Sequence, residues 1–272
     1  YTTLFRSGTS SIAYGTNDLY TDADGKLRIW LPNGDHEFVV DGDTWTVHVD
    51  GAETTAYVAS LGVTVNGTNV GYLSGEGWTL DRRTKIVSLT GAGPFTIGGA
   101  GDKVAIRADT NCTVVLDGLS LTNTVTGFPP FDCGTNSVSM SLSGTNSLVA
   151  SGENAPGLGV RNGGALDITG GDGSLSAQGG SFGAGIGSGR EELGGIVKIS
   201  GGKVSAQGGD QAAGIGGGFG SSGNLVLIAG GTILRSSGGE AGIGAPADGG
   251  AIITGGAVYR SADEFTPADI ND

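Results

Sequence analysis

Apolar residues recur with a fixed period along the second half of the chain. Between residues 156 and 260, four segments open alike, with an apolar residue between two glycines. That residue is Leu158, Ile186, Ile215 and Ile243, at intervals of 28, 29 and 28 residues. An internal repeat of roughly 20 to 50 residues indicates stacked units rather than an ordinary globular domain.

Each repeat contains three short apolar segments separated by glycine, rich in Ile and Val. Such segments are typical of strands. Three strands and three turns, with no run long enough for a helix, describe one rung of a parallel β-helix. Rungs stack about 4.8 Å apart and bury one another's apolar side chains. The predicted fold class is therefore all-β: a right-handed parallel β-helix of about six to seven rungs with a period near 28.

Three ladders of inward side chains extend this pattern toward the N-terminus. The first ladder is predicted to contain Ile106, Phe131, Leu158, Ile186, Ile215 and Ile243. The second is predicted to contain Leu89, Leu116, Leu142, Ile168, Ile199, Ile228 and Ile253. Its neighbour two residues earlier contains Val87, Val114, Met140, Leu166, Val197, Val226 and Ala251.

Residues 8–54 follow a different pattern, in which apolar and polar residues alternate. Asp24-Gly25, Asn33-Gly34 and Asp41-Gly42 predict three hairpin turns in an antiparallel module. The stretch resembles the last strands of immunoglobulin-like or transthyretin-like modules of bacterial surface proteins, in which a TDADGK…LPNG pattern recurs. A complete sandwich needs about 100 residues, so this module is predicted to be incomplete. His48 is predicted to face solvent from its strand rather than to act in catalysis.

The remaining boundaries follow from changes in this pattern. Residues 1–7, YTTLFRS, match the translation of a sequencing adapter, so we expect an artefact outside the fold of a truncated metagenomic reading frame. Residues 55–100 are predicted to lead into the helix and form its first rung, with Trp78 closing the open end. Residues 101–260 form the β-helix, and residues 261–272 form a C-terminal tail or partial cap.

The repeat motifs resemble those of β-helical surface proteins of gut and anaerobic bacteria. Their hallmarks stand here as AAGIGGG at 212–218 and KISGGKVSAQGG at 198–209, and the resemblance covers about residues 71–260. It implies a secreted or wall-attached protein that binds carbohydrate or acts as an adhesin. The architecture is also similar to that of the pectate-lyase-like superfamily, but a fold alone does not assign a function.

Composition and charge restrict the classes of possible binding partner. The net charge of −13 disfavours nucleic acid, whose phosphates require basic patches. No apolar run approaches the length of a transmembrane segment. Two cysteines are too few for a disulfide scaffold. Cys112 aligns with the inward Val138 and is expected to be a buried thiol; a disulfide with Cys133 is the alternative, which requires Cα atoms within about 7 Å.

One group of charged residues is the candidate ligand-binding site. Arg107, Asp109, Asp132 and Arg161 fall just after the first strands of neighbouring rungs, with Asp132 stacked on Arg107 and Arg161 near Asp109. The group could bind a sugar, with the two aspartates as ligands for Ca²⁺; no other cofactor is indicated. Replacing Asp132 and Arg161 is then expected to weaken binding without much loss of stability. The alternative is a set of surface ion pairs across rungs.

Three further features are weaker candidates for a functional site. Asp167 and Lys198 stack as an outward, solvated pair. The insertion at residues 189–192, Gly-Arg-Glu-Glu, is a charged loop. The glycines of the repeated Gly-Ile-Gly motif would give a flat outward strip for a polymer or sheet, or allow loops to pack closely.

Three functions remain open at this stage. The first is binding of a polysaccharide or a host glycan by a secreted or cell-surface protein. The second is a polysaccharide lyase or glycoside hydrolase that acts in a groove along the rungs, which would need carboxylates gathered on one face. The third is a structural stalk. The β-helix region contains no histidine and its carboxylates are scattered, which disfavours the enzyme.

Overall fold

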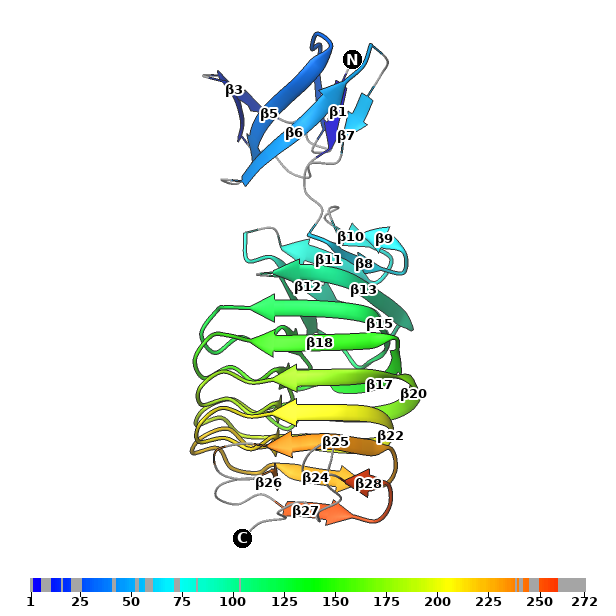
Figure 1. Ribbon diagram of the computed structural model, residues 1–272, viewed down its shortest axis with the longest axis vertical. Coiled ribbons are helices and arrows are strands. Elements are labelled where there is room, and N and C mark those ends of the chain that lie inside the picture. The colour runs from blue at the N-terminus through cyan, green and yellow to red at the C-terminus, as the bar shows by residue number, and fades with distance from the viewer. Residues whose placement is uncertain are drawn as a thin grey trace. The chain divides into compact units, whose positions relative to one another are not determined.

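The computed structural model describes residues 2–5, 11–15, 17–20, 26–40, 43–51, 54–56, 61–70, 74–81, 83–102, 104–237, 239, 242–244 and 250–258. The predicted tail at 261–272 lies outside the described residues. The chain divides into two compact units: residues 1–61 with 69–73, and residues 62–68 with 74–272. Every regular element within the described ranges is a β-strand (Figure 1), which confirms the all-β class.

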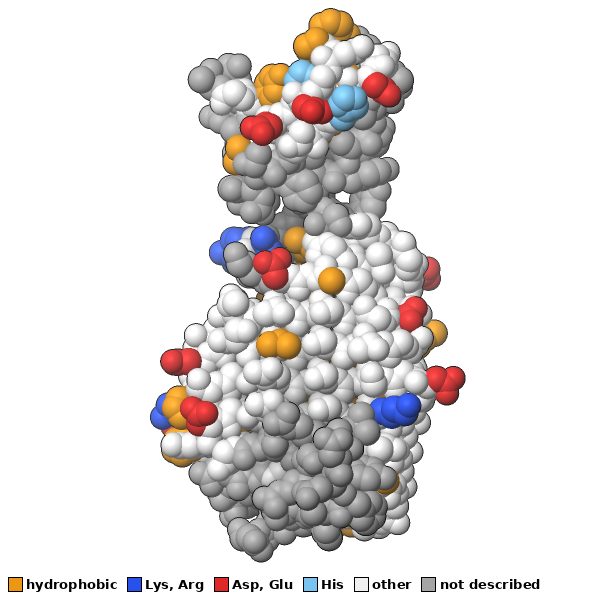
Figure 2. All heavy atoms as spheres, viewed as in Figure 1, with side chains coloured by type: hydrophobic (Ala, Val, Ile, Leu, Met, Phe, Trp, Pro, Cys, Tyr) orange, Lys and Arg blue, Asp and Glu red, His pale blue; other side chains and the backbone are white. Residues whose placement is uncertain are grey.

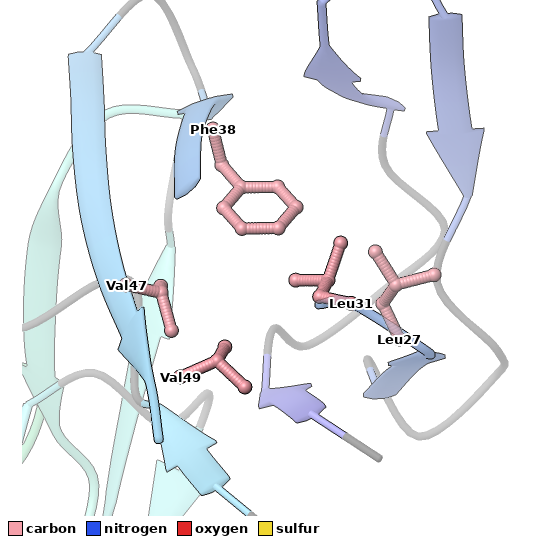
Figure 3. Packing of buried hydrophobic residues seen from close by; sticks show 5 residues of the cluster. All are labelled: Leu27, Leu31, Phe38, Val47 and Val49. Carbon is pink, nitrogen blue, oxygen red and sulfur yellow. The ribbon is translucent and has the colours of Figure 1, made fainter. Parts of the chain in front are cut away.

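The N-terminal unit contains two small sheets. One has the antiparallel order β3-β2-β5-β6, and the other the order β4-β1-β7. The strands are β1 (Thr2–Phe5), β2 (Ser11–Tyr14), β3 (Asn17–Tyr20), β4 (Lys26–Ile29), β5 (Gly34–Val40), β6 (Asp43–Val49) and β7 (Thr54–Ala56). Apolar side chains from these strands and the segment after β4 form its core (Figure 3), namely Leu27, Leu31, Phe38, Val47 and Val49.

Of the three predicted hairpins, the structure forms one. Asp41-Gly42 connects β5 to β6, which pair along their length. The hairpins at Asp24-Gly25 and Asn33-Gly34 are wrong, because the strands on either side of each turn belong to different sheets. Asp24-Gly25 itself lies outside the described residues. The chain passes from one sheet to the other between β3 and β4 and returns between β4 and β5, and the alternation of apolar residues does not distinguish such a crossing from a hairpin.

The two histidines have different surroundings. His48 is exposed, as predicted, and its Nδ1 lies 2.6 Å from a carboxylate oxygen of Asp35. His36 is buried, and its Nε2 donates to the carbonyl of Pro32 at 2.7 Å while Nδ1 lies 2.8 Å from the hydroxyl of Tyr14. Both nitrogens of His36 are therefore used in holding the module together.

The placement of the first residues contradicts the expectation that 1–7 lie outside the fold. β1 is the central strand of its sheet: it pairs antiparallel with β4 and parallel with β7. An artefactual sequence of strand-forming residues can still pair with neighbouring strands, so the adapter origin is a separate matter. For residues 2–5, the expectation of a place outside the fold is wrong.

Deleting residues 1–7 from the full chain is therefore expected to unravel the β4-β1-β7 sheet, because among the described strands β4 and β7 pair with β1 alone. Hydrogen exchange measured by mass spectrometry should show lost amide protection at 26–29 and 54–56. Protection at 196–199, in the other unit, is the internal control and should not change. Unaltered protection at 26–29 and 54–56 would instead place residues 1–7 outside the fold.

The second unit is a parallel β-helix, as predicted, and its stacked strands are visible in Figure 1. Its first sheet consists of the short strands that open each rung. The parallel strands, in stacking order, are β12 (Ile86–Leu89), β14 (Ala105–Ala108), β16 (Phe131–Asp132), β19 (Leu158–Gly159), β21 (Ile186–Gly187), β23 (Ile215–Gly216) and β26 (Ile243–Gly244).

The second sheet forms the other two sides of each rung. Its strands are β13 (Phe95–Asp102), β15 (Cys112–Asn123), β17 (Ser137–Ser143), β18 (Thr145–Ala150), β20 (Ala165–Gln178), β22 (Ile196–Gln207), β24 (Leu225–Ile228), β25 (Thr232–Ser237), β27 (Gly250–Ile253) and β28 (Ala257–Val258). The predicted second and third strands merge where the chain bends without leaving the sheet. β20 turns this corner at Gly170 and Gly171, with φ of 128° and 115°, values that favour glycine.

Antiparallel strands close the N-terminal end of both sheets. β11 (Trp78–Asp81) pairs antiparallel with β12 and with β10 (Ser74–Gly75). β8 (Val63–Val65) pairs antiparallel with β13 and lies next to β9 (Thr68–Asn69). Trp78 is buried in this region, where it was predicted to close the first rung. These strands cover edges that a bare solenoid would leave unpaired.

The register confirms the first ladder completely. Ile106, Phe131, Leu158, Ile186, Ile215 and Ile243 are successive partners in the first sheet, and all are buried. Val87 pairs with Ile106, so it belongs to this ladder, and its predicted place in the row two residues before the second ladder was wrong. The predicted place of Leu89 in the second ladder was also wrong, because Leu89 pairs with Ala108. The start of the second ladder is Ile97, the partner of Leu116.

The second ladder contains one further error. Leu116 pairs with Leu142 as predicted, but Ile168 pairs with Met140 rather than Leu142, and Leu166 pairs with Val138. The predicted alignment of the rungs matched their corner glycines, whereas in the structure the first residues of β17 and β20 are paired. Strands β15 and β17 have three inward residues before the corner, and later strands have two. The extra Leu142 side chain lies beside Gly202, where a Cβ would be only 3.1 Å from its Cδ1.

Candidate functional site

The four predicted site residues form two ion pairs that differ in exposure. Arg107 and Asp132 are neighbours in adjacent strands, as the sequence predicts. The Arg107 side chain, however, turns to Asp109, with Nε donating to Oδ1 at 2.5 Å and Nη2 to Oδ2 at 3.1 Å. These two side chains are 40% and 34% exposed. The hydrogen bond from Arg107 lowers the pKa of Asp109, although partial burial opposes this shift.

Asp132 and Arg161 form the buried pair. The guanidinium donates through Nε and Nη2 to the two carboxylate oxygens of Asp132, at 3.2 and 2.7 Å. Asp132 also accepts from the backbone N–H of Gly134 at 2.9 Å. Only 4% of the Asp132 side chain and 14% of the Arg161 side chain are exposed. Burial would lower the pKa of Arg161, but the hydrogen bonds and charge of Asp132 outweigh it, so the net shift is upward.

Glu192, which is partly exposed, is the second carboxylate partner of Arg161 and was not among the predicted site residues. Nη1 of Arg161 donates to Glu192 Oε1 at 2.5 Å and to the carbonyl of Gly127 at 3.3 Å. Glu192 Oε2 accepts from the backbone N–H of Gly189 at 2.8 Å. Arg161 therefore links the start of one rung to the charged insertion of the next. The insertion at 189–192 was the sequence signal, but nothing in the sequence indicated its partner.

These contacts separate the four residues that were predicted to form one ligand or calcium site. Arg161 lies against Asp132 and Glu192 rather than beside Asp109, so the predicted patch is divided between two pairs. Each aspartate already accepts hydrogen bonds from a guanidinium on both oxygens, which leaves a poor set of ligands for Ca²⁺. Within the described residues, no group of three His, Cys, Asp or Glu side chains could hold a metal ion. The arrangement is that of one ion pair within a rung, Arg107–Asp109, and one across adjacent rungs, Arg161–Asp132.

The two cysteines are buried and unbonded. Cys112 pairs with Val138 in the register that the sequence predicts, and both it and Cys133 are free thiols. Burial raises the pKa of Cys112 to about 11. Burial also raises that of Cys133, with the nearby Asp132 and Cys112 adding to the shift. Both thiols are therefore unreactive packing groups at neutral pH.

The glycine strip is buried rather than displayed. Gly187 and Gly216 lie inside the stack, with φ of 139° and 137°. A Cβ at Gly187 would collide with the carbonyl oxygen of Gly216, and one at Gly216 with that of Gly244. Glycine is needed here because backbone packs directly on backbone. The prediction that these glycines allow close packing is therefore confirmed, and the prediction of a flat outward strip for a polymer or sheet is wrong.

The structure places a shallow groove on the outer face of the second sheet. It has a volume of about 420 Å³ and crosses the beginnings of β15, β17, β20 and β22. One row of outward side chains runs along it at one residue per rung. By register, this row is Thr113, Ser139, Asp167 and Lys198. A second row of Ser137, Ala165 and Ile196 lines it beside the first.

The charged pair in the groove is the one predicted from the sequence. Lys198 Nζ donates to Asp167 Oδ2 at 2.7 Å, and the hydroxyl of Ser200 donates to Asp167 Oδ1 at 2.8 Å. The carboxylate is thus oriented by two donors, and the ammonium group retains further N–H donors. The sequence predicted this pair as a solvated contact, but it did not predict the concave surface around it.

Comparison with protein-family models, with curated proteins and with solved structures finds no match for this chain. Among the residues that the structure describes, no helix is long and apolar enough to cross a membrane.

Proposed function

We propose that this protein is a secreted or cell-surface β-helix that binds carbohydrate chains along the groove, and thereby mediates adhesion. The observation that carries the proposal is the row of polar side chains repeated at the rung spacing. Four rungs span about 14 Å, roughly the length of three sugar units. A polymer with a repeat near 5 Å can place one unit beside each of Thr113, Ser139 and the Asp167–Lys198 pair.

The chemistry of the lining suits neutral sugars. Hydroxyl groups of Thr113 and Ser139 both donate and accept, and Lys198 adds donors. Ala165 and Ile196 provide apolar surface for the C–H faces of pyranose rings. The resemblance of the repeats to those of bacterial surface proteins supports a location outside the cell.

The number of carboxylates in the groove favours a binding function over glycoside hydrolysis. Among the described residues that line the groove, Asp167 is the one carboxylate, whereas glycoside hydrolysis uses a pair about 5 to 9.5 Å apart. Asp167 is also held by Lys198 and Ser200, which favours a fixed acceptor over a mobile acid.

The test is a glycan array followed by calorimetry with the best oligosaccharide. We expect the Asp167→Ala/Lys198→Ala double variant to bind at least about tenfold more weakly, because two polar anchors are lost. Its melting temperature should change little, since a partly exposed ion pair contributes about 0 to 1 kcal/mol.

The matched control is Lys203→Ala, which removes an exposed charge from the same strand outside the groove lining. This variant should bind as the wild type does. Equal affinity of the groove double variant and the wild type, or an equal loss in the control, would contradict the proposed site. A reducing-sugar and unsaturated-product assay on the same ligand would reveal turnover and refute pure binding.

A further inference from the structure

A second cluster of side chains lies on the loops that return the chain to the first sheet. We call it the loop cluster: Phe182, Arg190 and Phe219. The guanidinium carbon of Arg190 lies 5.0 Å from the ring centroid of Phe182 and 5.3 Å from that of Phe219. The two rings are 5.8 Å apart and inclined at 51°. A cation at this distance from two aromatic faces is attracted to both.

Backbone hydrogen bonds fix this arrangement. Phe219 N–H donates to the carbonyl of Phe182 at 3.0 Å, and Glu191 N–H donates to that of Phe219 at 2.8 Å. Arg190 N–H donates to the carbonyl of Asn154 at 3.3 Å. Loops of successive rungs are therefore tied together, and the insertion is anchored further by the contact of Glu192 with Arg161. A site that is ordered before its ligand arrives loses little entropy on binding.

The end of the Arg190 side chain remains accessible. It is 39% exposed, and its Nε donates to Glu191 Oε1 at 3.0 Å. Neither Nη atom has a hydrogen-bond partner among the described residues. In Figure 1 the loops after β20 and β22 lie at the left edge of the β-helix, and Figure 2 shows hydrophobic, basic and acidic side chains gathered there.

This combination of groups selects a class of ligand. Two N–H groups of a planar fork can donate to two adjacent hydroxyls, and the neighbouring carboxylate of Glu191 can accept from one of them. The partly buried rings of Phe182 and Phe219 supply apolar surface beside that fork. The Arg190–Glu191 pair is neutral overall and the chain carries −13, so an uncharged ligand is favoured over an acidic one.

We infer that the loop cluster is a second binding site, which takes a short neutral saccharide through a vicinal diol. The inference rests on the proposed carbohydrate-binding function but uses residues separate from the groove. One guanidinium fork engages one pair of hydroxyls, so a mono- or disaccharide unit suffices here, whereas the groove fits a longer chain. Arg190 is the specific contact, and the two phenylalanines hold its guanidinium in place.

Saturation-transfer NMR on the full chain tests this with the methyl glycosides of glucose, galactose and mannose, and with glucuronic acid. At least one neutral glycoside should bind with a dissociation constant of about 1 mM. Arg190→Lys keeps the charge but removes the fork, and should weaken that binding at least about tenfold. Phe219→Leu, which removes one ring, should weaken it as well. Arg83→Lys, at an exposed arginine in the β11–β12 turn, is the matched control and should have no effect.

The outcomes separate this inference from the proposed function. Binding of a neutral glycoside that Arg190→Lys weakens and Asp167→Ala/Lys198→Ala does not supports the loop cluster, even if the groove binds nothing. Absence of any neutral signal, or equal signals for wild type and Arg190→Lys, overturns it, even if long glycans bind the groove. Tighter binding of glucuronic acid than of every neutral glycoside overturns the assigned ligand class.

Discussion

Asp132→Ala is expected to lower the free energy of unfolding by about 3 kcal/mol, because it leaves the buried guanidinium of Arg161 without its principal partner. The loss falls at the lower end of the usual range for a broken buried ion pair, since Glu192 still contacts Arg161. Asp132 also accepts the N–H of Gly134, which would lose that partner. Chemical denaturation of the β-helix unit measures the change.

The same face supplies the control. Asp109→Ala breaks a similar two-point pair with Arg107, but that pair is about a third exposed, so the cost should stay below about 1 kcal/mol. The double variant Asp132→Ala/Arg161→Ala should cost less than the sum of its single variants, because no unpaired charge remains. Equal costs for Asp132→Ala and Asp109→Ala would show that burial does not distinguish the two pairs.

Ile215→Ala is expected to cost about 2–5 kcal/mol through lost burial and the cavity that remains. Ile215 is completely buried, with Ile186 and Ile243 as its partners on either side. The backbones around it cannot move inward to fill the space, because the flanking glycines already pack against those of the next rung. Calorimetry should show a clear downward shift of the β-helix transition.

Ile196→Ala provides the matched comparison, since it makes the same change on the outer face, where the side chain is 41% exposed. Its cost should be within about 0.5 kcal/mol. If Ile215→Ala left the transition where it is, the first ladder would not form the core and the register described above would be incorrect.

The ladder of the first sheet could be predicted because its signal is local and repeated. The Gly-Ile-Gly motif identifies one inward side chain per rung. Its spacing of 28 or 29 residues predicts without ambiguity that Ile186, Ile215 and Ile243 are partners in successive rungs. The short motif is also bounded by glycines that only a stacked backbone explains. A one-residue slip within it would expose the isoleucine, so register is strongly specified.

The second ladder was harder because the rungs differ in length. Leu142 and Ile168 both precede a corner glycine, and alignment on that glycine places them together. In the structure the first residues of β17 and β20 pair with each other, and the corner of β20 comes one inward residue earlier than that of β17. A two-residue slip preserves which side chains point inward, so apolar periodicity alone cannot detect it.

The site was predictable only in part. Asp167 and Lys198 lie at equivalent positions of adjacent repeats, so their pairing could be read from the spacing. Arg161 and Glu192 come from non-equivalent positions, and an insertion brings them together, so no repeat alignment indicates the contact. Small side chains such as Ser139 and Ala165 line the groove, and the sequence pattern does not show that they lie on a concave surface.

The nearest-neighbour stacking of rungs also sets how the chain can change in length over evolution. Each strand of a rung bonds to its counterparts in the rungs before and after it. Duplication or loss of a whole repeat therefore rejoins matching surfaces and adds or removes one level, whereas a single inserted residue within a strand turns the following side chains to the wrong face. Recombination that adds or removes one whole Gly-Ile-Gly repeat would thus yield foldable descendants that are longer or shorter by 28 or 29 residues.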